Sequence, residues 1–230
     1  MESSEPPARP AMPAPEFGLP VRWLLFAAGV GIMSVGIAVS VHAALGTSPI
    51  STVPAALAGP LPLSFGRITI LMNLVFVAVQ AILLRRRFHP INILQIAVAV
   101  IFGWLCDVSL RLTGFLQPAD YLQQWLLVIL GAVLVSIGVF TQVLPRILYI
   151  PGEGIVAAIA TVSGWQFGTV KQCFDWFLVI LAVILSLWLS GELQGVREGT
   201  VFAAFVVGGL VKTYQRWWNR IRARRRPDPR

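Results

Sequence analysis

The chain has 230 residues, of which 57% are hydrophobic and 12% are charged, and its mean hydropathy is +0.77. One soluble core cannot bury that much apolar surface, so the composition excludes an ordinary soluble domain and indicates an integral membrane protein. The net charge of +8 is unevenly distributed, because residues 212–230 contain eight basic residues and one acidic residue. Basic residues confined to the end of one helix do not form a nucleic-acid-binding face, so no nucleic-acid partner is expected.

Residues 1–20 hold six of the sixteen prolines, which excludes a helix interior and favours a disordered tail. After this tail, six apolar stretches reach the roughly twenty residues that a membrane-spanning helix needs. They lie near residues 22–44, 66–85, 90–111, 124–147, 167–190 and 197–215. The sequence therefore predicts an all-α membrane protein with six transmembrane helices.

Arginine marks one side of the membrane. If both termini are cytoplasmic, then Arg22, residues 85–87, Arg146 and the basic C-terminal end all fall on the cytoplasmic side, as the positive-inside rule requires. Residues 114–123 then form an extracytoplasmic loop. Residues 216–230 form a basic cytoplasmic tail, whose arginines and tryptophans suit anionic lipid headgroups at the bilayer surface.

An internal repeat relates residues 21–113 to residues 124–215. When residues 23–84 are shifted by 102 positions onto residues 125–186, sixteen of the 62 compared positions are identical, whereas apolar composition alone gives roughly one match in ten. The identical pairs include Pro49 with Pro151 and Gly66 with Gly168, and a three-residue insertion extends the match to Gly103 with Gly208. Because three crossings reverse the chain direction, we expect two inverted three-helix repeats.

Each repeat is interrupted between its first and second helices by glycine, proline and small polar residues, in LGTSPISTVP from Leu45 and in YIPGEGIVAA from Tyr149. The apolar segment after each interruption is about half a spanning length. We interpret each as a short re-entrant half-helix, since irregular backbone at membrane depth must be buried in protein or line water. The alternative is a connector that lies flat at the membrane interface.

Candidate binding groups lie in these loops and on the helices that follow. A half-helix N-terminus carries positive partial charge and free amide groups that attract anions or carbonyl oxygens. Lys171 and Asp175 are one helical turn apart and can pair, and the repeat places Asn73 opposite Asp175. The hypothetical substrate-binding set is Thr47, Ser48, Ser51, Asn73, Gly152, Glu153, Lys171 and Asp175. The alternative is that these polar groups only hold helices together.

Known catalytic and metal-binding motifs are missing from the sequence. It contains no HExxH, GxSxG or phosphate-binding loop, so we expect no catalytic residues and no enzyme. Two cysteines, Cys106 and Cys173, lie within apolar runs and support neither a disulfide framework nor a metal site. We interpret both as packing residues and expect no cofactor.

Several motifs resemble those of the YczE/YyaS/YitT family of bacterial membrane proteins. In the first half these are LGTSPISTVP, LSFGRITILMNLVFVAVQAILLRRRF and NILQIAVAVIFGWLCD, and in the second half PGEGI, FGTVKQCFDWFLVILAVILSL and GVREGTVFAAFVVGGLVK. The resemblance covers residues 21–213. It implies a multi-pass protein of the bacterial cytoplasmic membrane, with some members described as permease-like, and it carries over no site residues.

Two functions remain open on the sequence. The first is a small secondary transporter or channel for a small solute, with an anionic solute as the favoured class and with its site at the membrane midplane between the repeats. The second is a non-transporting membrane scaffold or assembly factor whose basic tail recruits a partner or lipid. An oligomer is compatible with either function.

Overall fold

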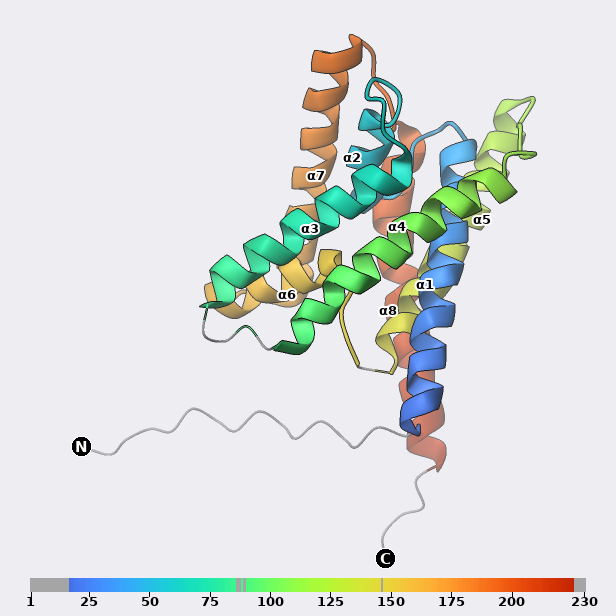
Figure 1. Cartoon of the computed structure of the whole chain (residues 1–230). Helices are drawn as coiled ribbons and strands as arrows, with labels where there is room; N and C mark the ends of the chain where they lie inside the picture. Colours follow the sequence, from blue (N-terminus) through green and yellow to red (C-terminus); the bar gives the residue numbers. More distant parts are fainter. Residues whose placement is uncertain (1–16, 86–87, 89, 146, 226–230) are drawn as a thin grey trace, which may run out of the picture.

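The computed structural model describes residues 17–85, 88, 90–145 and 147–225 (Figure 1). Throughout this part of the chain the regular secondary structure is helical. The elements are α1 (Leu19–His42), α2 (Pro49–Leu57), α3 (Phe65–Leu84), the 3-10 helix η2 (Pro90–Ile93), α4 (Leu94–Leu112), α5 (Tyr121–Val143), α6 (Pro151–Ser163), α7 (Phe167–Ser190) and α8 (Glu198–Arg225). The predicted disordered tail, residues 1–20, lies largely outside the described residues.

Five segments in the described part of the chain are long and apolar enough to cross a membrane, namely α1, α3, η2 with α4, α5 and α7. They indicate a multi-pass membrane protein. The sixth predicted span lies in α8, which is not among these segments because Glu198, Lys212 and the basic residues after 215 dilute its apolar stretch. The sixth crossing stays a prediction.

Helix ends follow the local sequence. α5 ends at Val143 and not at the predicted residue 147, because Pro145 cannot continue a helix and restricts the residue before it. α8 continues ten residues past the predicted boundary at 215 to Arg225, since neither glycine nor proline interrupts that segment. The basic tail is therefore helical over much of its length.

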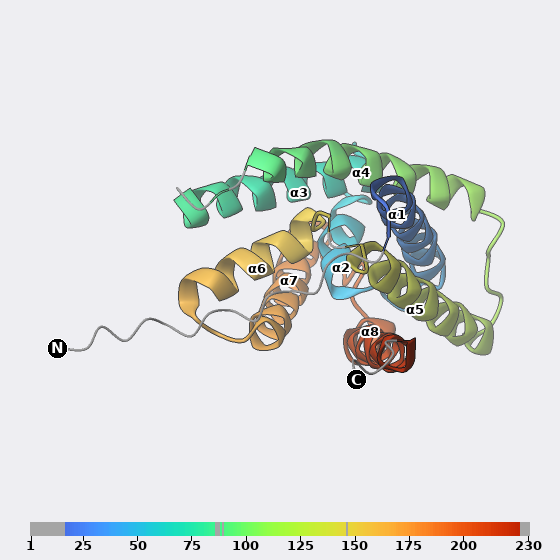
Figure 2. The same ribbon diagram turned by 90° about the horizontal axis from the view of Figure 1, so that it is seen from below.

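The two interruptions in the repeats are starts of short helices. α2 has nine residues and α6 has thirteen, which at about 1.5 Å per residue is too short to cross a bilayer. Pro49 and Pro151 are their first helical residues, where a missing N–H costs nothing. Figure 2 shows α2 at the centre of the helices, and most of its residues are buried. Re-entry into a bilayer stays a prediction, but α2 is packed inside the protein.

Helices α1 and α5 form the closest helix pair. A Cβ atom added to Gly36 would lie 2.6 Å from the backbone nitrogen of Val135, and one added to Gly138 would lie 2.6 Å from that of Met33. Glycines thus allow the two helices to pack closely. Gly31, also on α1, faces open space.

The remaining pairings mostly occur in corresponding sets. α2 packs on α7 while α6 packs on α3, and α4 packs on α1 while α8 packs on α5 (Figures 1 and 2). One pairing has no counterpart, because α3 lies along α4 but α7 and α8 do not pack together. The beginning of α1 and the end of α8 lie at the same end of the molecule, where the rings of Phe17 and Trp218 are 6.3 Å apart.

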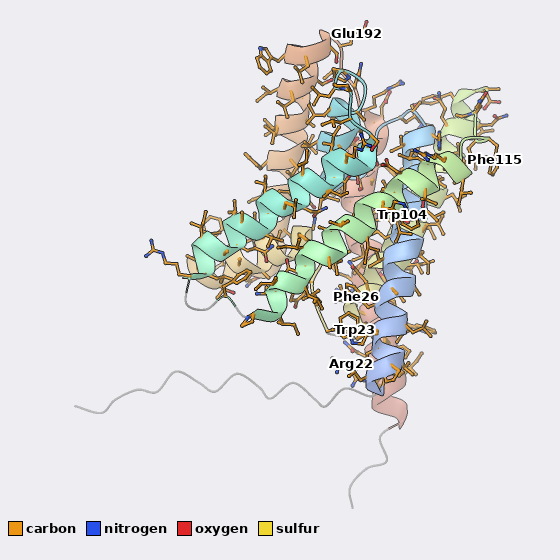
Figure 3. All side chains as sticks on the ribbon, viewed as in Figure 1. Arg22, Trp23, Phe26, Trp104, Phe115 and Glu192 are labelled. Carbon is orange, nitrogen blue, oxygen red and sulfur yellow. The ribbon has the colours of Figure 1, made fainter. Side chains whose placement is uncertain are left out.

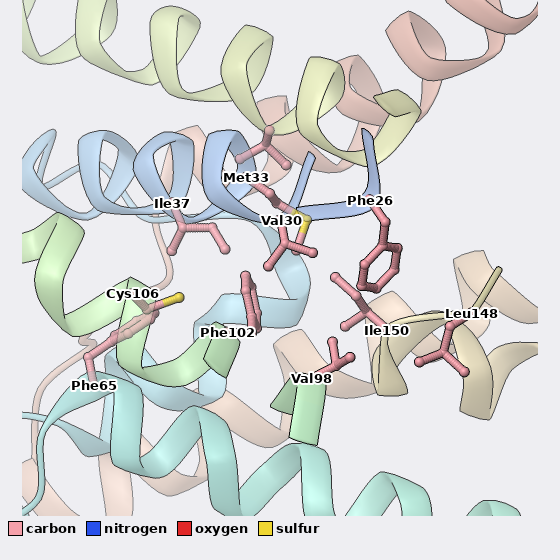
Figure 4. Packing of buried hydrophobic residues seen from close by; sticks show 11 residues of the cluster. Phe26, Val30, Met33, Ile37, Phe65, Val98, Phe102, Cys106, Leu148 and Ile150 are labelled. Carbon is pink, nitrogen blue, oxygen red and sulfur yellow. The ribbon is translucent and has the colours of Figure 1, made fainter. Parts of the chain in front are cut away.

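The main apolar cluster joins α1 to α4 and to the chain before α6 (Figure 4). Phe102 and Cys106 of α4 lie in it with Met33 and Ile37 of α1. The predicted packing role of Cys106 is confirmed, whereas that of Cys173 is wrong, because Cys173 is exposed on α7. Trp104 and Phe115 point outward (Figure 3), and they are 61% and 79% exposed, as expected for a surface that contacts lipid.

Candidate functional site

A cavity of about 700 Å³ lies between the two halves of the chain. Its wall is formed by α1, α2, α3, α5, α7 and α8, with Phe102 of α4 and the start of α6. This volume is in the range of small-molecule sites, which are mostly apolar with a few convergent polar groups. The cavity follows from the fold. The short helix α2 forms part of its wall at the centre of the molecule, and α7 and α8 line it without an extensive contact between them.

The structure brings six of the eight predicted binding residues to this cavity. They are Ser48, Ser51, Asn73, Glu153, Lys171 and Asp175. Thr47 and Gly152 do not line it. The backbone N–H of Thr47 donates to the carbonyl of Gly195 at 3.4 Å, and Gly152 packs against the side chain of Ile50. Both residues are buried next to the starts of the short helices, outside the cavity wall.

The first half contributes hydroxyl and amide groups. Ser48 Oγ donates to Ser51 Oγ at 3.1 Å within the first turn of α2. On α3, Asn73 Nδ2 donates to the carbonyl of Thr69 at 2.9 Å, which fixes the orientation of the amide because the reversed orientation would set two oxygens against each other. Asn73 is 2% exposed, and its Oδ1 has no hydrogen-bond partner.

The second half contributes the charged groups. Lys171 and Asp175 form the predicted ion pair one turn apart on α7. Glu153 lies in the first turn of α6, where the helix dipole favours a negative charge, and its Oε2 is buried without a hydrogen bond. Burial raises the pKa of the Glu153 carboxyl above its ordinary value, and the positive charge of Lys171 opposes that rise. Gln142 of α5 lies beside this carboxyl, and its buried amide also lacks a partner of good geometry.

The wall between α3 and α4 is closed by glycines. A Cβ atom added to Gly103 would lie 2.5 Å from the carbonyl oxygen of Gly66. Asp107 supports this contact by accepting from the amide of Gly66 at 2.7 Å and from Ser64 Oγ at 2.5 Å. No gap remains where these two helices meet.

The corresponding glycines of the second half are apart. A Cβ atom added to Gly168 of α7 or to Gly208 of α8 would meet nothing within 4 Å, and both glycines line the cavity. The cavity therefore extends between α7 and α8, where Lys212 and Gln215 also form part of its wall. The connection 191–197 joins the end of α7 to the start of α8 (Figure 1).

Sequence reasoning missed Trp176 and Lys212, which also line the cavity. A signal for Lys212 was present. The chain has sixteen arginines but only two lysines, Lys171 and Lys212, and both lie at the cavity. In the sequence, Lys212 follows an apolar stretch and begins the basic C-terminal end. In the structure, the continuous helix α8 places it on the cavity wall. No group of three or more metal-ligating side chains occurs among the described residues.

Comparisons with known proteins give a family but no activity. No curated protein and no solved structure matches the chain. The model of DUF6198, a family of unknown function, matches residues 20–216, which include every helix from α2 to α7 and the cavity wall. The chain therefore belongs to the DUF6198 family.

Proposed function

We propose that this protein is a small secondary transporter, in which two inverted three-helix repeats alternately open a central cavity to either side of the membrane. The observation that supports it best is the contrast between two equivalent glycine pairs. Gly66 and Gly103 are in contact, while Gly168 and Gly208 face open space. The halves thus adopt different conformations around one shared cavity.

Inverted repeats give a direct route to the second state. If the halves exchange conformations, α7 closes on α8 while α3 separates from α4, and the cavity opens at the other face. A glycine inside a helix costs roughly 0.5–1 kcal/mol relative to alanine. In the open state no neighbouring atom requires a glycine at position 168 or 208. A closed α7–α8 contact would require glycine at both positions.

The polar groups are placed as a solute site requires. Ser51 and Asn73 from one half meet Glu153, Lys171 and Asp175 from the other at the same cavity. A site shared between the halves stays near the axis about which they would move, so it can be reached in both states. The buried unpaired oxygen of Asn73 is costly unless a ligand or water completes its bonding.

A disulfide trap tests the motion. In a background with Cys106→Ala and Cys173→Ala, we would introduce Gly168→Cys and Gly208→Cys and oxidise the protein in lipid vesicles. A disulfide forms only when the two Cβ atoms approach to about 3.8 Å, so cross-linking requires closure of α7 on α8. We expect cross-linking, and we expect it to remove access to a thiol placed at Ser51 from the open side.

The matched control is the pair Gly31→Cys and Gly168→Cys. Gly31 also faces open space but lies on α1, so this pair reports random collision. If the Gly168–Gly208 pair cross-links no faster than the control, α7 and α8 form a static groove. That result would contradict alternating access and favour the scaffold function.

A further inference from the structure

We propose that Asn73 and Glu153 on the cavity wall bind the ammonium group of a small amine that has an apolar body. This inference rests on the proposed function only in treating the cavity as a solute site. It concerns the chemical class of the solute. The observation behind it is the kind of polar atom in the cavity that lacks a hydrogen-bond partner.

Among the described residues that line the cavity, the buried side-chain atoms without a hydrogen bond are two acceptor oxygens. The unpartnered amide of Gln142 lies beside Glu153 but does not line the cavity. Oδ1 of Asn73 has no partner because its Nδ2 is already committed to the Thr69 carbonyl. Oε2 of Glu153 is likewise buried without a hydrogen bond. Acceptors of this kind are satisfied by a ligand that donates, and an ammonium group donates up to three hydrogen bonds.

Anions find fewer donors on the same wall than a helix start usually offers. The ammonium of Lys171 is already paired with Asp175. Pro49 and Pro151, which begin the two short helices, have no N–H. The amide of Ser51 donates to the Ser48 carbonyl at 2.8 Å, and that of Gly154 donates to the Ile150 carbonyl at 2.9 Å. Part of the anion-binding capacity of each helix N-terminus is therefore missing or used within the chain.

The charge balance agrees with this assignment. The cavity wall carries two carboxyl groups, Glu153 and Asp175, and two ammonium groups, Lys171 and Lys212. Lys171 is paired with Asp175, and the charges that act on Glu153 are those of Lys171 and Asp175. When Glu153 is ionised, Lys171 is therefore shared between two carboxylates.

The rest of the wall suits an apolar body. Met33, Ile37 and Phe65 line one side, and Trp176 and Val179 of α7 line the other. On α8, Ala204, Gly208 and Gly209 leave room along the opening. A hydrocarbon or aromatic body can thus lie along this wall between α7 and α8.

The test compares two probes that share a body and differ in charge. Binding of 2-phenylethylamine and of 3-phenylpropanoate to the purified full-length protein in lipid nanodiscs would be measured by isothermal titration calorimetry. The variants are Asn73→Leu, which removes the acceptor at similar volume, and Glu153→Gln, which removes the charge. The control is Glu192→Gln, because Glu192 is an exposed carboxylate in the loop after α7.

We expect the amine to bind and the carboxylate not to bind, with each cavity variant weakening amine affinity by about tenfold or more and the control leaving it unchanged. The inference is overturned if the carboxylate binds better, if neither probe binds, or if neither variant weakens the amine. Amine binding without α7–α8 cross-linking would contradict the transport proposal but not the solute class. Cross-linking without amine binding would contradict the solute class but not the transport proposal.

Discussion

The amide of Gly66 donates a hydrogen bond of 2.7 Å to Oδ1 of Asp107, which joins the first turn of α3 to α4. Asp107 lies one turn after Gly103, and the residue one turn after Gly208 in the other half is Lys212. A lysine cannot accept from the amide of Gly168, and its positive charge is unfavourable at the N-terminus of α7. Asp107 thus favours contact of the two helices in the first half, and Lys212 provides no equivalent bond in the second half.

Lys212→Asp is therefore expected to favour closure of α7 on α8. The new carboxylate can accept from the amide of Gly168, as Asp107 does from that of Gly66, and the repulsion at the helix end is removed. The measurement is the rate of disulfide formation between Gly168→Cys and Gly208→Cys, which should rise about tenfold for a gain near 1.4 kcal/mol. Lys212→Ala, which only removes the repulsion, should give a smaller rise. An unchanged or slower rate for Lys212→Asp would show that the charge does not control the gap.

Gly103→Val and Gly208→Val should separate stability from motion. Valine at 103 must displace the Gly66 backbone and the Ile70 side chain, so we expect a loss of about 1–3 kcal/mol in stability and a lower Tm. Valine at 208 meets open space, so Tm should change little. The added side chain should, however, prevent α7 from closing on α8. Thermal unfolding in detergent compares the two, and equal losses of Tm would contradict the assigned gap.

Lys171→Gln should destabilise the protein more than Lys171→Gln combined with Asp175→Asn. The single change leaves the buried carboxyl groups without a cation, whereas the double change removes one of them. We expect a loss of about 1–3 kcal/mol for the single variant, partly restored in the double variant. Additive losses in a double-mutant cycle of unfolding free energies would mean that the ion pair is not coupled.

Amine binding should strengthen as pH rises from mildly acidic to neutral and above. Burial raises the pKa of Glu153, so this carboxyl stays protonated above its ordinary range and becomes a negative partner only as pH increases. Lys171 and Asp175 of α7 also act on Glu153, with opposite effects, and Gln142 of α5 is its uncharged neighbour. Titrations of 2-phenylethylamine across pH should show this rise, and Glu153→Gln should flatten it.

The same pKa shift predicts the sign of a stability change. A carboxyl group whose pKa is raised in the folded protein binds more protons folded than unfolded, so its contribution to stability falls as pH rises through the range above its ordinary pKa. Glu153→Gln should remove that fall. The check is the difference in Tm between parent and variant at several pH values, and a difference that does not depend on pH would contradict the shift.

Local features of the sequence were sufficient to predict where most of the helices lie. Apolar runs of spanning length predicted five segments that the structure contains, and Pro49 and Pro151 marked the starts of the two short helices. The spacing of Lys171 and Asp175 predicted their ion pair. These features depend on hydropathy, proline geometry and helical periodicity, which act over a few residues and can be read without knowing the partner helix.

Only the tertiary structure decided which residues reach the cavity. The repeat treats Gly66 and Gly168 as equals, yet one touches a neighbouring helix and the other faces open space. Thr47 belongs to the same loop as Ser48, yet it is buried behind the wall that Ser48 lines. The distance between two helices is set by side-chain packing and by charges far apart in the chain, such as Asp107 and Lys212. The amino-acid sequence by itself thus determined the helices and the polar groups, and the packing of the helices decided which of those groups line the cavity.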